Sequence, residues 1–489
     1  MSLSSGKFFY SEEELSLLVC LANDSFVRSF EDFGYITNQR TRQDRIYDAS
    51  GKIFLQQLSR NPQSTDDITD SLMEIFTGVS REELAADFAE FVNDLEADGF
   101  IVSGMTEDEI TAKMPRFSYG QSDRKTAPRT DFDSSHDAIA TTEFLSDYFR
   151  DNPQIFSFQF ELTSRCNERC RHCYLPGSRD FHDMETDLVM SILDQLAEMG
   201  TLKVTFSGGE CFLHPDFIPI LRHARENDFS ISVLSNVTLL TDEIISALKD
   251  ANIDLLQASV YSMNPDEHDY ITQVPGSHAK TIQSLERLIA ANVPVQISCP
   301  TMRKTYESYK AVLEWAYSHG IKGYTDYIMM ARTDKSTDNL ANRLTLDETE
   351  SLLRDIINYD IEYRAILDTN AEPEPLNPDE RVCGAGVDSM CVAANGEFYP
   401  CSGFQGWPLG NAHELTVSDV WNNSEALKKL RAVTRKDFPE CMKCEAKPYC
   451  AMCMVRNLNE TGSIFTVSKH FCDVAFINKR LVEEYMKGR

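Results

Sequence analysis

Long apolar runs are missing from this sequence. Among its 489 residues there is no stretch of 18 consecutive apolar residues, and the N-terminal Met-Ser-Leu-Ser-Ser-Gly-Lys has no apolar signal segment. These absences exclude a membrane-spanning helix and predict a cytoplasmic protein. The length is sufficient for several domains, and a hydrophobic content of 42% can furnish sizeable cores.

Positive charge is also scarce. The chain has 47 Lys and Arg residues against 77 Asp and Glu residues, which gives a formal net charge of −30 at pH 7. Nucleic acids and anionic membranes both require basic residues to neutralise phosphate, so neither is expected as a partner. A partner that is steered by charge should be basic, or it should bind through apolar contacts.

Cysteine, in contrast, is abundant. The sequence contains 14 cysteines, which in a protein that is not exported indicates metal or redox use rather than disulfides. Eleven of them lie in residues 166–173 and 383–472, and this clustering favours metal ligation over scattered core thiols. Of the others, Cys20 and Cys299 are expected to be buried small apolar residues.

The first cysteine group is Cys166, Cys170 and Cys173, spaced C-x3-C-x2-C just after the apolar run 155–162. Three thiolates on one loop can hold three corners of a 4Fe–4S cubane, which leaves one iron without a protein ligand. A catalytic metal site keeps such a position open. From spacing alone, a zinc loop that lacks one ligand and a set of three unrelated core thiols remain alternatives.

Together with the segment Lys203-Val-Thr-Phe-Ser-Gly-Gly-Glu210, this loop resembles the radical S-adenosylmethionine (SAM) superfamily. In that family the Gly-Gly-Glu segment holds the amino group of SAM, whose amino and carboxylate groups chelate the open iron. The resemblance therefore implies SAM as a cofactor, and it implies cofactor-binding roles for Ser207, Gly208, Gly209 and Glu210. Many relatives have proline next, whereas this chain has Cys211, for which packing is the expected role.

By position, the resemblance implies further SAM contacts. His172 stands where the family often has an aromatic residue against the adenine, although it can also be an ordinary loop histidine. Ser235 and Asn236 end the third strand, where polar contacts to the ribose or carboxylate are placed, and Ser259 ends the fourth. Arg303, after the fifth strand, is a candidate to pair with the SAM carboxylate.

Residues 151–370 alternate extended apolar runs with helical patterns. Strands are expected at 155–162, 202–207, 230–235, 254–260, 294–299 and 323–329. Helices are expected near 185–198, 215–227, 241–251, 280–291 and 306–319. Six βα units predict an α/β fold with a parallel sheet. The resemblance implies a partial (β/α)6 barrel, open to a large substrate, with its functional groups at the carboxyl ends of the strands.

Residues 1–110 predict a winged-helix-like α+β domain. Extended pieces at 7–10 and 33–38 precede a helix over 66–77 with Thr65 as N-cap, a second helix over 80–98, and a strand from Phe100. A DNA-binding role is disfavoured because residues 61–100 carry eleven acidic residues and a single arginine.

The arrangement of this N-terminal domain resembles the RiPP recognition element, the PqqD-like domain of enzymes that modify ribosomal peptides. The resemblance implies that the leader of a precursor peptide adds a strand to an exposed sheet edge. Residues 111–150 are predicted to be a linker.

Residues 371–489 resemble the SPASM domain, the C-terminal extension of peptide-modifying radical SAM enzymes. The opening pattern C-x12-G-x4-C fits that domain, whereas the second motif ends C-x2-C where the family has C-x3-C. The resemblance implies two auxiliary clusters, one held by Cys383, Cys391, Cys401 and Cys453, the other by Cys441, Cys444, Cys450 and Cys472. A pair of zinc ribbons is the alternative.

The sequence therefore predicts a peptide-modifying oxidoreductase with SAM and three 4Fe–4S clusters. Its expected partners are a precursor peptide and a reductant such as ferredoxin or flavodoxin. Thioether formation from cysteine to carbon is the first choice, with a carbon–carbon link or formylglycine-type oxidation of a protein as alternatives. A non-catalytic winged-helix regulator with iron–sulfur or zinc sites is the alternative of a different class. No protein residue is assigned as catalytic, because the radical is carried by the cofactor.

Overall fold

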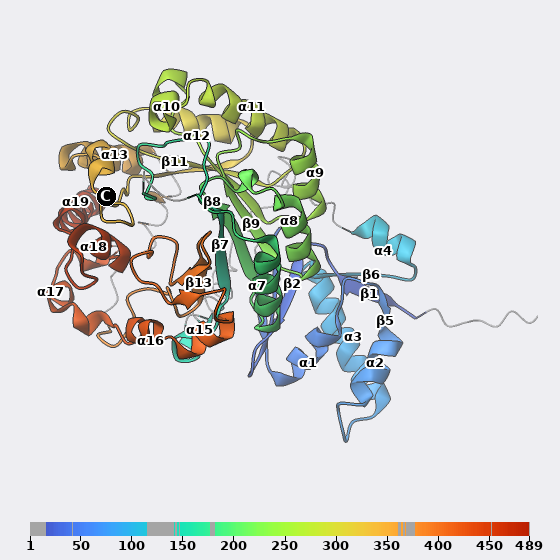
Figure 1. Cartoon of the computed structure of the whole chain (residues 1–489). Coiled ribbons are helices and arrows are strands. Elements are labelled where there is room, and N and C mark those ends of the chain that lie inside the picture. Colours follow the sequence, from blue (N-terminus) through green and yellow to red (C-terminus); the bar gives the residue numbers. More distant parts are fainter. Residues whose placement is uncertain are drawn as a thin grey trace, which may run out of the picture. The chain divides into compact units, whose positions relative to one another are not determined.

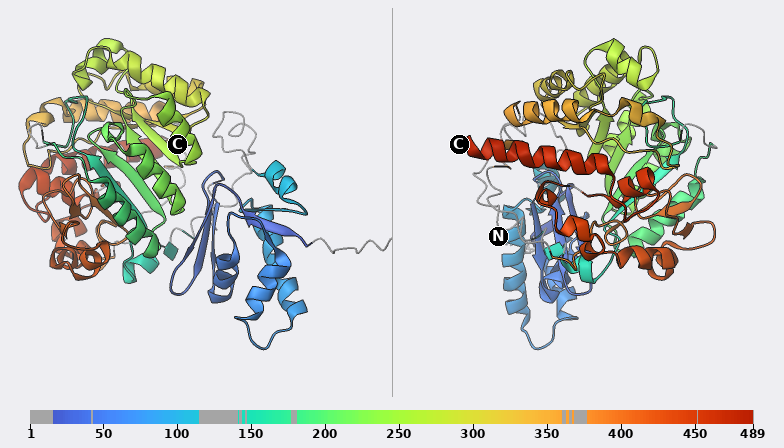
Figure 2. Two further views of the ribbon diagram at one scale, coloured as in Figure 1. Left: turned by 45° about the vertical axis from the view of Figure 1, so that its right-hand side comes forward. Right: turned by 90° about the vertical axis from the view of Figure 1, so that its left-hand side faces the viewer.

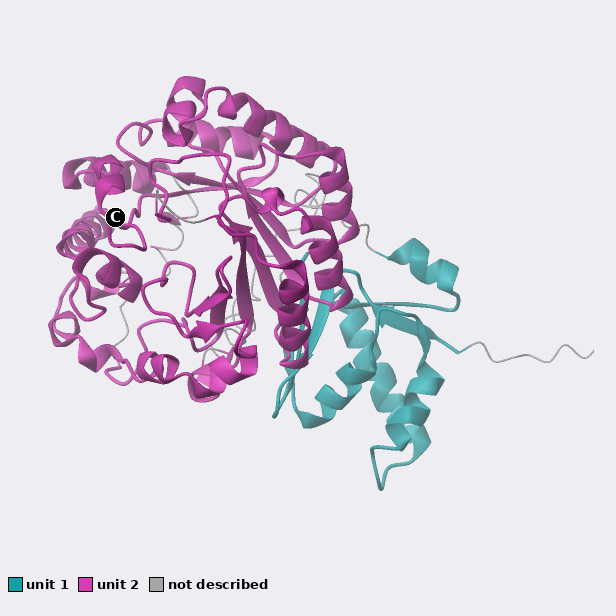
Figure 3. Ribbon diagram, viewed as in Figure 1, with its two compact units in different colours: residues 1–117, 137–141 teal, residues 118–136, 142–489 magenta. Residues whose placement is uncertain are grey.

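A computed structural model of the chain falls into two compact units (Figure 3). Unit 1 comprises residues 1–117 and 137–141, and unit 2 comprises 118–136 and 142–489. The residues that the structure describes are 16–41, 43–114, 141, 144–145, 147–176, 181–359, 363–364, 367, 377–450 and 452–488. The extended piece expected at 7–10 and most of the predicted linker 111–150 lie outside these residues.

Unit 1 contains two small antiparallel sheets and four described helices (Figure 1). One sheet has the strand order β5-β1-β6, and the other has the order β2-β3-β4. The strands are β1 (Leu18–Leu21), β2 (Ser25–Ser29), β3 (Gly34–Asn38), β4 (Gln43–Tyr47), β5 (Gln63–Ser64) and β6 (Ile101–Gly104). The helices are α1 (Ala49–Gln57), α2 (Thr65–Met73), α3 (Arg81–Ala97) and α4 (Glu107–Lys113).

Two predictions for α2 are wrong in detail. The N-cap is Ser64, not Thr65, because the extended backbone of Ser64 lets its hydroxyl accept hydrogen bonds from the amides of Asp66 and Asp67. The helix also ends at Met73 rather than at Thr77, since the amides of Glu74 and Ile75 bond three residues back and tighten the last turn.

Helix α3 follows the predicted pattern. Its buried side chains are Leu84, Phe88, Val92 and Leu95, and Ser80 with Glu83 forms a capping box at its start. Gly99 stops the helix with a φ of +76°, which glycine adopts without strain.

Unit 2 is built on a nine-stranded sheet with the order β12-β11-β10-β9-β8-β7-β13-β14-β15 (Figure 1). Strands β7 to β12 are mutually parallel and follow chain order, which confirms the predicted α/β barrel. Their bounds are β7 (Ser157–Thr163), β8 (Lys203–Gly208), β9 (Ser230–Ser235), β10 (Leu255–Ser259), β11 (Val295–Pro300) and β12 (Lys322–Asp326).

Helices cover the outer face of this sheet. They are α7 (Thr186–Glu198), α8 (Phe217–Glu226), α9 (Asp242–Asp250), α10 (Pro265–Thr272), α11 (Ser277–Ala290), α12 (Tyr309–Ser318) and α13 (Leu346–Tyr359). Helix α10 was not among the predicted elements. The core between helices and sheet includes Phe158 and Phe160 of β7 and Phe206 of β8, all with no exposed surface. Because side chains alternate along a strand, Gln159 of β7 points to the other, open face.

The C-terminal segment extends the barrel sheet. Strand β13 (Ser389–Val392) pairs in parallel with β7, so that Cys391 lies opposite Gln159. Strands β14 (Glu397–Tyr399) and β15 (Gly410–Asn411) continue the sheet in antiparallel fashion. The cysteine-rich segment is thus fixed beside the strand that leads into the first cysteine loop, an arrangement that the sequence did not predict.

Helices complete the C-terminal segment. They are α15 (Val417–Asn423), α16 (Glu425–Arg431), α17 (Pro439–Met442), α18 (Met454–Thr461) and α19 (Lys469–Lys487). Helix α19 runs beside α13 (Figure 2), with Leu353, Ile357, Ile477 and Leu481 in one apolar cluster. None of the described helices combines the length and the apolar character needed to cross a bilayer.

Candidate active site

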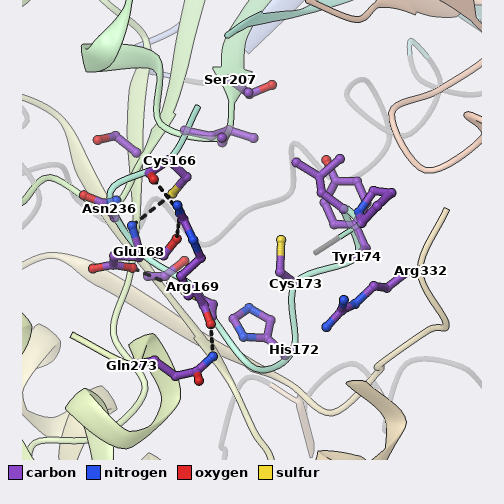
Figure 4. A pocket seen from close by; sticks show the side chains of 18 of the residues that line it. Cys166, Glu168, Arg169, His172, Cys173, Tyr174, Ser207, Asn236, Gln273 and Arg332 are labelled. Atoms are coloured by element: carbon purple, nitrogen blue, oxygen red, sulfur yellow. Dashed lines mark hydrogen bonds between the residues drawn. The ribbon is translucent and has the colours of Figure 1, made fainter. Parts of the chain in front are cut away.

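A cavity of about 400 Å³ lies at the carboxyl ends of strands β7 to β10 (Figure 4). This is the end of a parallel α/β barrel at which binding groups gather. Its wall combines the cysteine loop, the Gly-Gly turn and the ends of β9 and β10. The residues that line it include Gln159, Cys166, Glu168, Cys170, His172, Cys173, Ser207, Gly208, Gly209, Ser235, Asn236, Gln257, Ser259, Tyr261 and Arg332.

The cysteine loop that follows β7 is anchored at both ends. At its start, the guanidinium of Arg165 donates two hydrogen bonds to the carboxylate of Asp183, at 2.9 and 2.5 Å. Further along, the amides of Arg169 and Arg171 donate to the carbonyls of Thr272 and Ile271 at the end of α10. The loop is therefore held in place, and the thiols of Cys166 and Cys173 point into the cavity (Figure 4).

The Gly-Gly turn approaches this loop at very short range. The amide of Gly209 donates to the carbonyl of Thr163 at 2.7 Å, and that of Glu210 donates to the carbonyl of Arg165 at 2.8 Å. A Cβ on Gly209 would lie 2.2 Å from the Arg165 carbonyl oxygen, and Gly208 has a φ of +137°. Both positions therefore require glycine, and together they bring the turn against the cysteines.

Glu210 does not line the cavity. It is buried, and its carboxylate accepts hydrogen bonds from the Ser235 hydroxyl at 2.8 Å, the Asn236 amide at 2.7 Å and the Phe212 amide at 3.1 Å. Burial raises the pKa of Glu210, and these hydrogen bonds oppose the rise. The side chain thus ties the Gly-Gly turn to the end of β9. Neighbouring Cys211 is fully buried in the core, as expected of a packing residue.

The other predicted SAM contacts divide into two groups. His172, Ser235, Asn236 and Ser259 all line the cavity. Arg303 is not among the lining residues; its half-exposed guanidinium lies 3.5 Å from the carboxylate of Glu348.

A different arginine, Arg332, stands on the cavity wall. It belongs to the segment after β12, and its guanidinium pairs with Asp338 at 3.0 Å. Gln159 and Gln257, which lie within β7 and β10 and face the cavity, were not among the predicted site residues. Their polar character amid apolar strand residues was the available signal.

Two thiols of the loop, Cys166 and Cys170, are in an environment that disfavours their charged form. Burial raises the pKa of Cys166 to about 11, and the carboxylates of Glu210 and Glu168 act in the same direction. Burial likewise raises the pKa of Cys170 well above its usual range. Thiolates at these positions therefore require a positive partner, which an iron–sulfur centre supplies. The donor set fits such a centre.

The C-terminal segment brings four of its cysteines near one another beside β7. Burial raises the pKa of Cys401 to about 12, with the neighbouring thiols of Cys453 and Cys383 contributing. The pKa of Cys391 is raised well above its usual range by burial, and then by Glu161 and Cys401. These are the four residues that the resemblance assigns to the first auxiliary cluster; the ligation itself stays a prediction.

A second group forms around α17 and the start of α19. Burial raises the pKa of Cys441, and the thiols of Cys472, Cys450 and Cys444 add to the effect. Within the described ranges, no three Cys, His, Asp or Glu side chains converge as ligands of one metal ion would.

Behind the cysteine loop lies a row of aromatic rings. The ring of His172 meets that of Tyr261 edge-on at 5.0 Å, and the ring of Tyr261 lies 5.2 Å from that of His268. The Tyr261 amide donates to Nδ1 of His268 at 3.4 Å, so this nitrogen is unprotonated. Burial lowers the pKa of His268 to about 4, and the nearby His278 acts in the same direction. His268 is therefore neutral at physiological pH.

Family profiles match three segments of the chain. The radical SAM superfamily matches residues 160–316, the SPASM iron–sulfur cluster-binding domain matches 383–445, and coenzyme PQQ synthesis protein D (PqqD) matches 46–101. The three matches fall in the barrel, the C-terminal segment and unit 1, in agreement with the predicted fold class.

Curated relatives match about three fifths of the chain. The AdoMet-dependent heme synthase of Methanosarcina barkeri is 26% identical over 323 residues, covering 62% of this chain and 92% of that protein. The antilisterial bacteriocin subtilosin biosynthesis protein AlbA of Bacillus subtilis is 27% identical over 309 residues, covering 61% and 67%.

Among solved structures, Streptococcus suis SuiB bound to precursor peptide SuiA superposes with a TM-score of 0.59 at 15% identity, covering 92% of this chain and 98% of that chain. At this identity the likeness establishes a shared fold.

Replacing Gly209 with Ala should abolish the close approach of the Gly-Gly turn to the cysteine loop. The new Cβ would overlap the Arg165 carbonyl oxygen at 2.2 Å, so the turn must move away from the cavity. We expect the affinity for SAM to fall by about 100-fold or more, because the displaced turn no longer holds its backbone groups at the positions from which they would contact the cofactor. Equilibrium dialysis with reconstituted protein measures this. Gly488→Ala is the matched control, since its Cβ would meet nothing closer than 3.6 Å; equal affinities in both variants would refute the steric role.

Acidification should destabilise the protein through His268. An unfolded histidine titrates near pH 6.5 whereas the folded pKa of His268 is about 4, so the unfolded state binds the extra proton first and stability falls as the pH drops through this window. His268→Gln keeps an acceptor for the Tyr261 amide but does not titrate. Between about pH 7.5 and about pH 5, we expect the variant to lose about 2 kcal/mol less stability than the wild type. Guanidinium unfolding at both pH values tests this, and parallel losses would contradict it.

Proposed function

The chain is a radical SAM enzyme with SPASM and PqqD domains, and on this premise we propose that it matures a ribosomally made precursor peptide by forming a cross-link in it. One observation supports this above all. Three thiols and a Gly-Gly turn line one cavity at the open end of the barrel, and the same chain carries a PqqD domain.

The domains that match are ones that bind SAM and 4Fe–4S clusters. In the proposal, Cys166, Cys170 and Cys173 hold the SAM-binding cluster, while the two C-terminal sets of four cysteines hold two auxiliary clusters. When bound and reduced, the cluster would supply the one electron that cleaves SAM into methionine and a 5′-deoxyadenosyl radical, which would take a hydrogen atom from a carbon of the peptide.

The residues of the chain position the cofactor and exclude water. Backbone groups of Gly208 and Gly209 face the cavity because no side chain intervenes, and they are proposed to receive the amino group of SAM. Ser235 and Asn236 line the neighbouring part of the wall at the end of β9, and Ser259 lines it at the end of β10. The neutral ring of His172 offers an apolar surface for the adenine.

The proposed role of unit 1 is to bind the leader of the precursor. Strand β4 pairs with β3 on one side and forms an edge of its sheet, which suits the addition of a peptide strand through main-chain hydrogen bonds. Behind it, the Tyr47 and Phe91 rings pack edge-on at 5.0 Å. The acidic residues of α3 favour a leader with basic side chains.

The identity of the cross-link is a finer proposal. A thioether from cysteine to carbon is the first choice, and a carbon–carbon link or a formylglycine-type oxidation of a protein is the alternative. The auxiliary clusters would take the electron that the substrate radical loses, and a ferredoxin or flavodoxin would supply the electron that starts each turnover. The mass of a co-expressed peptide separates a cross-link, which removes two hydrogens and keeps all other atoms, from oxidation of a cysteine to formylglycine, which loses the sulfur. Alkylation of free thiols then separates a thioether, which consumes a cysteine thiol, from a carbon–carbon link, which leaves the thiol free.

Replacing Cys166, Cys170 and Cys173 together with Ala should abolish SAM cleavage. Without thiolates on the loop, the cluster that chelates SAM cannot assemble, whereas the C-terminal cysteines should retain about eight irons per chain. Chromatography of 5′-deoxyadenosine after reduction, together with iron analysis, tests both expectations. A Cys20→Ala variant is the control, as this thiol is buried in unit 1. Persistent 5′-deoxyadenosine in the triple variant would refute the assignment.

Removing unit 1 up to residue 117 should weaken leader-dependent binding. We expect the affinity for a leader-bearing peptide to fall at least about tenfold, since one of two linked binding sites is lost. Fluorescence anisotropy with a labelled leader peptide measures this, and peptide-independent SAM cleavage by the same truncated protein serves as the control for an intact barrel. Unchanged affinity would remove leader binding from the proposed function.

A further inference from the structure

Tyr261 reaches the sulfur of one of the three loop cysteines. It lies just beyond the end of β10, its side chain is only 4% exposed, and its phenol oxygen is 3.7 Å from Sγ of Cys170. The distance is suitable for an O–H donor and a sulfur acceptor. A phenol has an ordinary pKa of about 10 and keeps its proton at neutral pH. A Cys170 thiolate has no proton, so in that state Tyr261 must be the donor of this hydrogen bond.

The second polar contact of Cys170 is of the opposite kind. Its thiol donates to Oε2 of Glu168 at 3.3 Å. A ligating thiolate has no proton to donate, so this hydrogen bond is lost when Cys170 binds iron. Among the hydrogen bonds of the described residues to Sγ of Cys170, the phenol is then the donor that remains.

The phenol of Tyr261 is held rigidly at this position. The ring lies between that of His172 at 5.0 Å and that of His268 at 5.2 Å, and its backbone amide is bound to His268. Ser259, two residues before Tyr261, lines the cavity together with Tyr261 itself.

We propose that Tyr261 is a positioning residue that raises the reduction potential of the cluster held by Cys166, Cys170 and Cys173, by donating a hydrogen bond to the Cys170 thiolate. One-electron reduction, with the electron coming from a low-potential donor, adds one negative charge to the cluster and its thiolates. The hydrogen bond is stronger to the more negative form, so it stabilises the reduced state. The inference rests on the proposed function insofar as that function places a cluster on this loop.

The test compares full-length Tyr261→Phe with the wild type, both reconstituted anaerobically. The signal of the SAM-binding cluster is first identified as the part of the electron paramagnetic resonance spectrum that responds to SAM, and is then titrated with dithionite in the absence of SAM. At a fixed solution potential we expect the ratio of reduced to oxidised cluster to fall by up to about tenfold, because only the difference in hydrogen-bond strength between the two oxidation states contributes, and the full hydrogen bond to a charged group sets its upper limit. For a one-electron couple this limit equals about 59 mV.

Two further proteins make the result decisive. Tyr309→Phe makes the same chemical change at a buried tyrosine that bonds to Asp355, and it should leave the ratio unchanged. Site-specific 3-fluorotyrosine at position 261 keeps the shape but is a stronger donor, and it should raise the ratio. Opposite shifts in the phenylalanine and fluorotyrosine proteins support the proposal, and if the phenylalanine variant fails to assemble its cluster, the fluorotyrosine protein decides alone.

The outcomes separate this inference from the proposed function. A SAM-responsive signal in the wild type with no shift in either Tyr261 protein overturns the role of the phenol and leaves the function intact. A wild type without any SAM-responsive signal overturns the proposed function itself.

Discussion

The active site depends on a contact that exists only because two side chains are missing. The Gly-Gly turn after β8 lies so close to the cysteine loop after β7 that a single methyl group on Gly209 would overlap the backbone of Arg165. Two main-chain hydrogen bonds hold the turn there. Buried Glu210 then connects the turn to the end of β9. Three consecutive strands are thus joined around one cavity, and the geometry of the thiols follows from that connection.

This arrangement buries acidic groups and thiols, whose charged forms are unfavourable away from water. Glu210 and Glu168 are acidic groups beside thiols in a poorly solvated pocket, and each disfavours ionisation of the others. Such a pocket is stable in the absence of a metal centre only while its groups keep their protons. When iron binds, the thiols lose their protons and the positive charge of the metal takes their place. Metal binding is therefore coupled to the folding of the surrounding loops.

The parallel sheet, the three-part organisation and part of the lining of the cavity were predictable, since each depends on local patterns. Alternating apolar runs specify the strands, and Gly208 with Gly209 marks a turn. What could not be predicted depends on contacts between distant segments. Nothing in residues 389–392 indicates pairing with β7, and the position of Arg332 follows from how the chain returns after β12. Arg303 was chosen because it follows a strand, yet side-chain direction decides which arginine lines the cavity, and a sequence pattern does not specify that direction.

The pairing of β13 with β7 also has a consequence for the order of assembly. The first barrel strand is made early, but its neighbour on one side emerges from the ribosome only when residues 389–392 have been synthesised. Until then β7 presents an open edge, which is a template for unwanted pairing with other chains. We therefore expect this edge of the barrel to stay open until the start of the C-terminal cysteine-rich segment has been synthesised.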